Sequence, residues 1–524
     1  MSLPCVAADP SDSRRRTLTS PRLYPLVAIL LLAAALRLPL AFWPNFHHPD
    51  EIYQYLEPAW RMLGHDSVIT WEWRYGMRSW LLPTLMVGPV AIGDWIAPGG
   101  IGAFILPRIV VAIASLSIVA SAWAFGARVS RTHSILAAFV AAIWFEFVYF
   151  APHTLSEPIA TAAILPAALL LTRSAPSSRN LVEGGALAAL AFLFRLQYAP
   201  AIAVLVLGAC WRNWERLPPL VLGGAAVLAI GGAIDVAHGA VPFGWVVANI
   251  EQNFLHDRAV EFGTAPATTY VVWLWDRWSI VIVPLSFAIF RGYRHAPLLF
   301  WVAVTDMAFH SLIAHKEPRF VFLSMTALII IAALGSADWV LLSRLAWRRW
   351  AGLAIAGGWV AASAALAATG EWPALWMKGI GAARLAAELK ADPQMCGLAL
   401  YDLYFFKLPS RDRLVGDAPL FGFYARDPLA GDQLSHVTRD ASTAFNRILA
   451  LRSNEKELPA NFKVRDCRSI DGAPVCIFAR DGKCNASAAA SFTTNDVLKR
   501  MNLSSPRRIG HATRSRLRAV RISP

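Results

Sequence analysis

Apolar stretches of about 20 residues recur along most of this chain, separated by short polar segments. Each stretch is long enough to cross the roughly 30 Å hydrocarbon layer of a bilayer as a helix. A helix satisfies its backbone hydrogen bonds within one segment, which makes it the expected spanning element. The pattern therefore predicts an all-α polytopic membrane protein with about 11 spans. The predicted spans cover approximately residues 22–43, 103–125, 134–151, 157–173, 183–198, 199–212, 217–238, 271–290, 296–313, 319–342 and 350–370.

Two parts of the pattern depart from a regular series of spans. Segment 80–97 is apolar, but Pro83 and Pro89 interrupt it, and an internal proline removes a helical hydrogen bond. Segments 183–198 and 199–212 are short for a full crossing. We therefore interpret 80–97 as an interfacial or re-entrant piece of a loop. We expect the short pair to reach only part of the way through the bilayer.

The distribution of arginine tests this assignment, because cytoplasmic loops of membrane proteins are rich in Lys and Arg. The N-terminal segment 1–21 contains an arginine cluster, which we place in the cytoplasm. The arginine-bearing loops between later spans then fall inside only if 80–97 does not cross. The remaining large regions, 44–102, 239–270 and 371–484, accordingly lie outside.

Composition excludes an ordinary soluble protein. Of the 524 residues, 56% are hydrophobic and 16% are charged, and the formal net charge is +14. A soluble domain carries about 25% charged residues. Nucleic-acid binding is one interpretation of the net charge, but the arginines lie mainly in short loops, where they set topology. We therefore expect the lipid bilayer, and no nucleic acid, as a partner.

The chain changes character after residue 370, where the predicted transmembrane domain 22–370 ends. Region 371–484 alternates apolar runs with turns, which predicts a small mixed α/β domain outside the membrane. Its four cysteines fit disulfides in an oxidising compartment, in a pairing that the sequence leaves open. The last stretch, 485–524, is polar and basic with few large apolar residues, which predicts a disordered tail. The four cysteines are Cys396, Cys467, Cys476 and Cys484.

Candidate chemistry begins in the first outer loop, which opens with the letters HHPDEIYQYLEP. Asp50 and Glu51 are adjacent carboxylates a few residues beyond the end of a span. Pro49 favours an extended entry, and the helical pattern that follows would place Asp50, Gln54 and Glu57 near one face. Asp50 is either a helix N-cap or a general base, with Glu51 as its catalytic neighbour. We expect Gln54 and Glu57 to contact the substrate.

The same loop continues with aromatic and charged residues in the letters TWEWRYGMRS. This mixture is typical of a membrane interface. It also suits sugar recognition, in which aromatic faces meet the ring and charges meet the hydroxyls. The interface alone accounts for the tryptophans but less well for Glu72 and Arg78. We predict that Trp71, Glu72 and Trp73 bind substrate and that Arg78 helps to bind a donor phosphate.

A second polar concentration, HKEPRF, lies between two predicted spans on the same outer side. Outer loops are usually poor in Lys and Arg, yet this one holds two cations, a histidine and a carboxylate. One interpretation is an ion-paired loop anchor. The other is a phosphate site, because cations just outside the hydrocarbon can hold a lipid phosphate. We predict that His315, Lys316 and Arg319 bind this phosphate and that Glu317 contacts substrate.

Three further charged residues lie inside or near the membrane. Arg37 occupies the last third of the first span, and Arg195 interrupts an apolar stretch. An intramembrane arginine needs a partner or a polar cavity. Arg37 either extends outward to the interface or binds the donor phosphate. Glu157, in a short outer loop, is either a helix cap or a substrate contact at the edge of the same cavity.

These segments together resemble glycosyltransferase family 22, which contains the eukaryotic α-mannosyltransferases of N-glycan and GPI-anchor assembly. The family's first-loop pattern is matched from His48 to Glu57 and from Thr70 to Ser79. Its His-Lys-Glu-x-Arg-Phe pattern is matched from His315 to Phe320. The resemblance covers about residues 20–330, and both motifs occur in the right order. One departure is Pro318, where many relatives have a second acidic residue.

The resemblance implies a GT-C glycosyltransferase fold with its active site on the non-cytoplasmic face. It implies a polyprenyl-phosphate sugar donor, a glycan or glycolipid acceptor, and inversion at the anomeric carbon. The family's essential loop acid falls on Asp50, with Glu51 beside it. Short loops rich in Ala and Arg suggest a bacterial protein of the inner membrane; a eukaryotic protein would lie in the endoplasmic reticulum.

The expected activity is therefore hexosyl transfer, with mannose as the expected sugar. A monophosphate leaving group carries less charge than a diphosphate, so cationic side chains can replace a metal, and we expect neither metal nor cofactor. A transporter or flippase for lipid-linked glycans is the alternative. It predicts charges near the membrane midplane and internal repeats, whereas the charge clusters here lie in outer loops. A non-catalytic scaffold that binds partners through 371–484 is a third interpretation.

Overall fold

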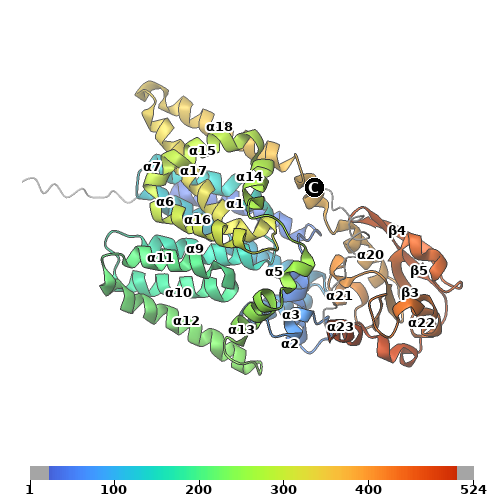
Figure 1. The fold of residues 1–524 in the computed structure, drawn as a ribbon. Coiled ribbons are helices and arrows are strands. Elements are labelled where there is room, and N and C mark those ends of the chain that lie inside the picture. Colours follow the sequence, from blue (N-terminus) through green and yellow to red (C-terminus); the bar gives the residue numbers. More distant parts are fainter. Residues whose placement is uncertain (1–22, 504–524) are drawn as a thin grey trace, which may run out of the picture.

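The computed structural model describes residues 23–503, which form a helical bundle, a small sheet domain and a layer of short helices between them (Figure 1). The sheet domain comprises residues 380–503, and the intermediate layer includes α2 and α3 of the first loop (residues 44–102). The helices of the bundle are α1 (Tyr24–Arg37), α5 (Ile101–Ala114), α6 (Leu116–Ala127), α7 (Arg131–Ile143), α8 (Phe145–Phe150), α9 (Ser156–Leu171), α10 (Ser178–Phe194), α11 (Ala199–Cys210), α12 (Leu217–Ala237), α14 (Thr269–Trp278), α15 (Ile282–Gly292), α16 (Pro297–Leu312), α17 (Phe322–Leu342) and α18 (Arg348–Ala367).

Every predicted span contains a helix, and α17 lies at the centre of the bundle. It is apolar on nearly all sides, as a helix surrounded by other helices must be. Of its most apolar stretch of 18 residues, 89% is buried. Six helical stretches in the described part of the chain are long and apolar enough to cross a membrane. Others, including α7, α9 and α16, are shorter apolar helices. The prediction of an all-α polytopic bundle is confirmed.

The helix ends that carry arginine lie together, as the distribution of arginine along the sequence predicted. At one end of the bundle, Arg128 donates to Leu169 and Thr172, and Arg216 donates to the carbonyl of Ser174. At that same end Arg294 pairs with Asp338, 2.9 Å away, at the far end of α17. The loops predicted to be cytoplasmic therefore meet at one end of the bundle.

Asp338 also contacts two histidines, and together they have the character of a metal site. His133 Nε2 lies 3.3 Å from Asp338 Oδ1, and His295 Nε2 lies 3.0 Å from Oδ2. These three residues are close enough to share a metal ion. Their carboxylate is already paired with Arg294, so the cluster joins α7 and α17 at the end of the bundle that carries the arginines.

Helix α4 (Leu81–Ile96) corresponds to the apolar segment that we interpreted as part of a loop. Just before its first turn, the Trp80 ring stacks on His238 at the end of α12. At its other end, Gly93 packs so closely on Gly102 that a side chain would collide with that carbonyl. The next turn, at Gly100, touches Asp412 of the sheet domain. Both ends of α4 thus lie at the same end of the bundle, as expected for a helix that does not cross.

The C-terminal region folds as the predicted mixed α/β domain. Its sheet has the strand order β2-β1-β3-β5-β4, with β1, β2 and β3 parallel and with β5 antiparallel to both β3 and β4. The strands are β1 (Leu398–Tyr401), β2 (Leu420–Phe423), β3 (Arg447–Leu451), β4 (Lys463–Ile470) and β5 (Ala473–Ala479). The helices in this part of the chain are α19 (Trp372–Met377), α20 (Ile380–Lys390), α21 (Arg411–Val415), α22 (Leu434–Asp440) and α23 (Thr494–Leu503).

All four clustered cysteines form disulfides, and the structure supplies the pairing that the sequence left open. Cys467 and Cys476 face each other across β4 and β5. Cys396 and Cys484 join the segment just before β1 to the segment after β5. Cross-links of this kind persist in oxidising compartments.

The prediction that 485–524 is a disordered tail is wrong for its first part. Residues 486–492 form 3₁₀-helical turns, and α23 follows. Val497 and Leu498 of α23 are buried in the sheet domain, and Asn495 hydrogen-bonds to Ile69 and Ser67 of the first loop. Few apolar residues suffice here because helical spacing brings them to one face. Residues 504–524, like 1–22, lie outside the described part of the chain.

Glu57 joins the sheet domain to the first loop and does not face the substrate region as predicted. Its buried carboxylate accepts the backbone N–H of Val68 at 2.9 Å and that of Arg411 at 2.5 Å. The Tyr53 hydroxyl donates to the carbonyl of Phe405 nearby, at 2.8 Å. Burial raises the pKa of Glu57 to about 7, although the two N–H groups partly oppose the shift.

Replacing Glu57 by alanine should loosen this junction. Two buried N–H groups would lose their acceptor, at about 1–3 kcal/mol each. We expect a lower thermal midpoint in detergent and faster amide exchange at Val68 and Arg411. Glu455→Ala, at an exposed site in the sheet domain, is the control and should change neither. Unchanged exchange in Glu57→Ala would contradict the assignment.

The raised pKa of Glu57 also predicts a pH dependence. The folded protein binds this proton more tightly than the unfolded chain does, so the contribution of Glu57 to stability is fully present below about pH 4.5 and falls as pH rises to about 7. Thermal midpoints measured across this range should decline more steeply in the wild type than in Glu57→Ala. Equal slopes would show that Glu57 does not titrate in this window.

Candidate active site

The first loop begins with an irregular helical turn at Asp50. Residues Glu51–Leu56 form a stretch of π-helix, marked by an i→i+5 hydrogen bond from Glu57 N–H to the carbonyl of Ile52, and α2 (Glu57–Met62) follows. π-Helical turns are rare and often occur at functional sites. The wider turn separates side chains that an α-helix would align, so Asp50 and Glu57 point to different surroundings. The prediction of a shared face is therefore wrong.

Asp50 forms ion pairs at the end of the bundle that lies next to the sheet domain. Its Oδ2 accepts a hydrogen bond from Arg319 Nη2 at 2.8 Å, and its Oδ1 lies 3.3 Å from His48 Nδ1. Burial alone would raise the pKa of Asp50, but the charges of His48 and Arg319 outweigh it and hold this pKa well below the usual aspartate value. The side chain keeps 16% of its surface exposed. An ionised, partly accessible carboxylate of this kind can accept a proton from an incoming hydroxyl.

Arg319 joins the two sequence motifs. Besides Asp50, its guanidinium contacts Glu317 at 2.6 Å and Glu157 at 3.0 Å. It is only 3% exposed, and a buried arginine requires such partners. Pro318 begins the short 3₁₀ turn Pro318–Val321 that holds Arg319 above α17. The structure thus brings Asp50, Glu157, Glu317 and Arg319 together, as the shared sidedness of their loops predicted.

Arg195 completes this group, although it was not among the predicted site residues. It lies in the extended link between α10 and the 3₁₀ turn Leu196–Tyr198. Its guanidinium is 3.0 Å from Glu157 Oε1 and lies over the ring of Phe320, 4.8 Å from the centroid. One carboxylate therefore serves two arginines. An arginine inside an apolar stretch was the sequence signal for this role. We call Asp50, Glu157, Glu317, Arg195 and Arg319 the acid–arginine cluster.

Two histidines border the acid–arginine cluster. His315 Nε2 is 3.1 Å from Glu317 Oε1, and His48 Nε2 is 3.5 Å from the same oxygen. Burial lowers the pKa of His315, but the Glu317 carboxylate outweighs this effect and raises it above the usual histidine value. Burial likewise raises the pKa of Glu317, but Arg319 and His48 hold it well below normal. His315 is thus favoured in its protonated form beside Glu317, and His48 lies between Glu317 and Asp50.

The second part of the first loop contributes the other predicted substrate residues. Arg78 Nη2 lies 3.5 Å from Glu72 Oε1. Burial lowers the pKa of Arg78, but the charges of Asp50, Tyr55 and Glu72 outweigh it and raise the pKa above normal. Arg78 therefore lies within electrostatic reach of Asp50, and Glu72 pairs with Arg78. Gln54 donates weakly to Thr70, with 3.4 Å between the atoms, and leaves its buried carbonyl oxygen without a partner in the described residues.

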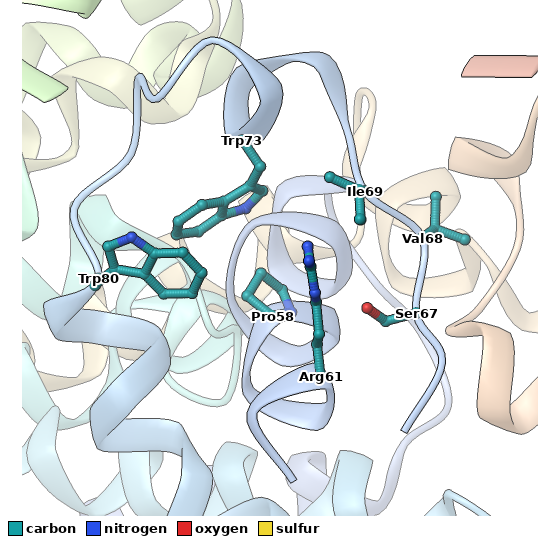
Figure 2. A pocket seen from close by; sticks show the side chains of 7 residues that line it. All are labelled: Pro58, Arg61, Ser67, Val68, Ile69, Trp73 and Trp80. Carbon is teal, nitrogen blue, oxygen red and sulfur yellow. The ribbon is translucent and has the colours of Figure 1, made fainter. Parts of the chain in front are cut away.

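The two predicted tryptophans face in different directions. In α3 (Trp71–Arg74), Trp71 stacks on Phe262 of the region 239–270, with centroids 5.9 Å apart. Trp73 instead packs against Trp80 and lines a hollow beside α2 (Figure 2). Neither tryptophan is fully buried.

Glu51 and Arg37 are not brought to the acid–arginine cluster. Glu51, 1% exposed, accepts hydrogen bonds from the backbone of His47 and His48 and contacts His153 at 2.8 Å, so it organises the loop entry. Arg37 donates to the carbonyls of Ala33, Ala141 and Ala142. The last carbonyls of α7 lack helical partners, which explains why a buried arginine is held there instead of at a phosphate site.

Lys316 lies in the predicted phosphate loop but does not face Asp50. Its ammonium donates to the carbonyl of Ile313 within its own loop, and no contact with the acid–arginine cluster is present in the described residues. The anchor interpretation therefore fits Lys316, whereas Arg319 fits the site interpretation.

The chain is similar to known proteins in sequence and in fold. The Alg9-like mannosyltransferase family matches residues 28–370. Human GPI alpha-1,2-mannosyltransferase 3 is 25% identical over 333 residues, which cover 60% of this chain and 57% of that protein. GPI mannosyltransferase 3 of Yarrowia lipolytica is 27% identical over 319 residues, which cover 58% and 61%. That of Aspergillus fumigatus is 41% identical over 73 residues, which cover 13% and 10%. The matches thus span less than two thirds of these relatives.

Solved structures with the same fold come from ArnT of Cupriavidus metallidurans. Its complex with undecaprenyl phosphate has a TM-score of 0.55 at 13% identity, covering 87% of this chain and 98% of ArnT. The apo form has a TM-score of 0.57 at 14% identity, covering 88% and 98%.

The helical bundle and the sheet domain together have the GT-C fold of these structures. Because the family match covers more than half of the sequence, the chain belongs to the Alg9-like mannosyltransferase family.

The ion pairs of Asp50 predict how activity depends on pH. If Asp50 is the general base, its depressed pKa keeps it ionised as pH falls, and activity is lost only as pH passes through that pKa. His48→Gln removes the largest favourable charge on Asp50, so its pKa should rise and the acid limb of kcat/KM should move to higher pH. His256→Gln, at an exposed position, should leave the profile unchanged. An unmoved acid limb in His48→Gln would contradict the role of His48.

Proposed function

We propose that this protein transfers mannose from a polyprenyl-phosphate donor to a glycan or glycolipid acceptor, with inversion at the anomeric carbon. The observation that carries the proposal is the Asp50 carboxylate, ion-paired with Arg319 at the end of the bundle that lies next to the sheet domain. Family membership supports the sugar. ArnT, which has the same fold, binds undecaprenyl phosphate, and this supports a polyprenyl-phosphate donor.

Asp50 is the proposed general base. The acceptor hydroxyl attacks the anomeric carbon as its proton passes to Asp50, so one C–O bond forms while the bond to the donor phosphate breaks on the opposite face. Proton removal by a positioned carboxylate contributes about 10²–10⁴-fold to the rate. Arg319 orients Asp50 and keeps it ionised before the acceptor arrives.

The leaving lipid phosphate carries the negative charge that develops in the reaction. Arg319 pairs directly with Asp50. Glu157 holds Arg195 beside Arg319, and Glu317 holds His315 beside it as well. Arg78 lies within electrostatic reach of Asp50. Glu157 holds Arg195 and Arg319 close together despite their like charge. Fixed cations that face a developing anion lower the barrier without reorganising. In this proposal the set replaces Lys316 and Arg37, which the sequence pattern had suggested for the phosphate.

The active site faces the non-cytoplasmic side in this proposal. The arginine-bearing helix ends lie at the other end of the bundle, where the positive-inside rule places the cytoplasm. The two disulfides of the sheet domain favour an oxidising compartment on the side of Asp50. The membrane would be the inner membrane of a bacterium or the endoplasmic reticulum of a eukaryote.

Asp50→Asn should reduce transfer at least about 100-fold, because the amide keeps the shape of the side chain but cannot accept the proton. The assay supplies radiolabelled lipid-phosphate mannose to membranes and follows label in the acceptor fraction. Asp432→Asn, at an exposed position in the sheet domain, is the matched control. Ordinary turnover by a well-expressed Asp50→Asn protein would refute the proposed mechanism.

Arg195→Gln should weaken use of the donor more than use of the acceptor. Losing a charged hydrogen bond to phosphate costs about 1.5–3 kcal/mol, so we expect the donor KM to rise roughly tenfold to hundredfold. Arg195→Lys keeps the charge and should recover part of the loss. Equal changes in donor and acceptor KM, or a change in kcat alone, would mean that Arg195 acts only as a structural partner of Glu157.

A further inference from the structure

A small hollow that is open to solvent lies beside α2, on the side of the first loop that meets α23. The rings of Trp73 and Trp80 form one wall, and the Arg61 side chain stands opposite Trp73 (Figure 2). The remaining lining comes from the helix α2 and the segment that follows it. These lining residues are Pro58, Ser67, Val68 and Ile69.

The aromatic wall has the character of a sugar platform. The Trp73 and Trp80 rings are tilted by 47° with centroids 4.5 Å apart, and Trp80 is supported from another direction by the stacked ring of His238. The buried indole N–H of Trp73 has no hydrogen-bond partner within residues 23–503. A buried donor without a partner costs free energy, which a ligand oxygen would recover. Apolar ring faces combined with a free N–H match the mixed surface of a pyranose.

Arg61 adds an uncompensated positive charge. It is exposed, and it makes no ion pair or hydrogen bond within the described part of the chain. A second cation, Arg74, lies close by: burial chiefly lowers the pKa of Arg74, the charge of Arg61 lowers it further, and the charge of Asp496 partly opposes the shift. Two neighbouring arginines, one of them unpaired, favour an anionic group.

The hollow adjoins the active site through two elements. Pro58 and Arg61 follow Asp50 along one helical run, so at about 1.5 Å per residue they lie roughly 12–16 Å from it. In α3, Glu72 pairs with Arg78 near Asp50, whereas the adjacent Trp73 lines the hollow. This distance exceeds one sugar ring, so a molecule that reaches both places has several sugar units.

We propose that the hollow binds a sugar unit of the acceptor that lies some units away from the reacting hydroxyl and carries an anionic group, either a phosphate ester or a carboxylate. The sugar ring stacks on Trp73 and Trp80, an oxygen accepts from the Trp73 indole, and the anion pairs with Arg61. The inference rests on the proposed glycosyl transfer, and it defines the acceptor as a charged oligosaccharide.

The test measures binding to the full-length protein in detergent, without donor, by saturation-transfer NMR and titration. The probes are mannose 6-phosphate, glucuronic acid, methyl α-mannoside and inorganic phosphate. We expect at least one of the two anionic sugars to bind more tightly than both methyl α-mannoside and inorganic phosphate. Whichever of mannose 6-phosphate and glucuronic acid binds more tightly identifies the anion. Arg61→Gln should weaken that binding about tenfold, the effect of losing one charged hydrogen bond. Trp73→Leu should weaken both the anionic and the neutral sugar.

Matched variants outside the hollow control for general effects. Arg179→Gln changes an arginine that is 85% exposed and pairs only with Glu183, and Trp95→Leu changes an exposed tryptophan of α4. Neither should alter binding. The inference is overturned if no sugar binds, if inorganic phosphate binds as well as the tighter-binding anionic sugar, or if Arg61→Gln binds like the wild type.

Failure of this inference is distinguishable from failure of the proposed function. Binding is measured without donor or turnover, so an inactive enzyme can still bind the anionic sugar at the hollow. Conversely, normal transfer by a protein that binds none of the probes would refute the acceptor subsite and leave the role of Asp50 intact. In the transfer assay, Arg61→Gln should raise the acceptor KM while the donor KM stays constant.

Discussion

The architecture of the site depends on a buried arginine that is surrounded by three carboxylates. Arg319 is almost fully enclosed, and leaving water is costly for a guanidinium unless anions replace it. Asp50, Glu157 and Glu317 supply that replacement from three separate parts of the chain. Because the arginine cannot remain buried without them, the ion pairs fix the first loop against the bundle. The same contacts leave Asp50 ionised and partly exposed, which is the state that a base requires.

In the proposed reaction, the charge arrangement also explains how the site would accept a lipid phosphate. Three acids surround two arginines in the acid–arginine cluster, Arg78 adds further positive charge near it, and His48 and His315 lie at its border. Glu157 alone offsets the repulsion between Arg195 and Arg319. An incoming phosphate would add a second anion between these cations. The side chains that bind the donor are therefore held in place before it arrives.

Much of this organisation could be predicted from sequence. The arginine-bearing loops predicted which loops lie on each side of the membrane. That assignment placed Asp50, Glu157 and the loop of Arg319 at one end of the bundle. Glu57 could not be placed, because a π-helical turn rotates it away from Asp50 and the local pattern does not distinguish π from α. Arg195 attracted attention as an intramembrane charge, but its partner Glu157 lies 38 positions earlier and only the fold brings the two together.

The misread C-terminal segment has a similar physical origin. α23 contains few apolar residues, yet Val497 and Leu498 are buried, and Asn495 ties it to the first loop. Composition averages over a segment, whereas burial depends on one helical face. Arg37 illustrates the opposite case. Its position suggested a phosphate, but the helix end beside it offers carbonyl groups that require donors.

The central claim is that Asp50 and Arg319 act as one unit in the reaction. A double-mutant cycle of transfer rates, with Asp50→Asn, Arg319→Gln and the double variant, tests it directly. If the pair acts together, the double variant should be about as slow as the slower single variant, with a coupling energy within the range of about 0.5–3 kcal/mol found for residues in contact. Losses that simply multiply would contradict the claim, because they would mean that the two residues contribute independently.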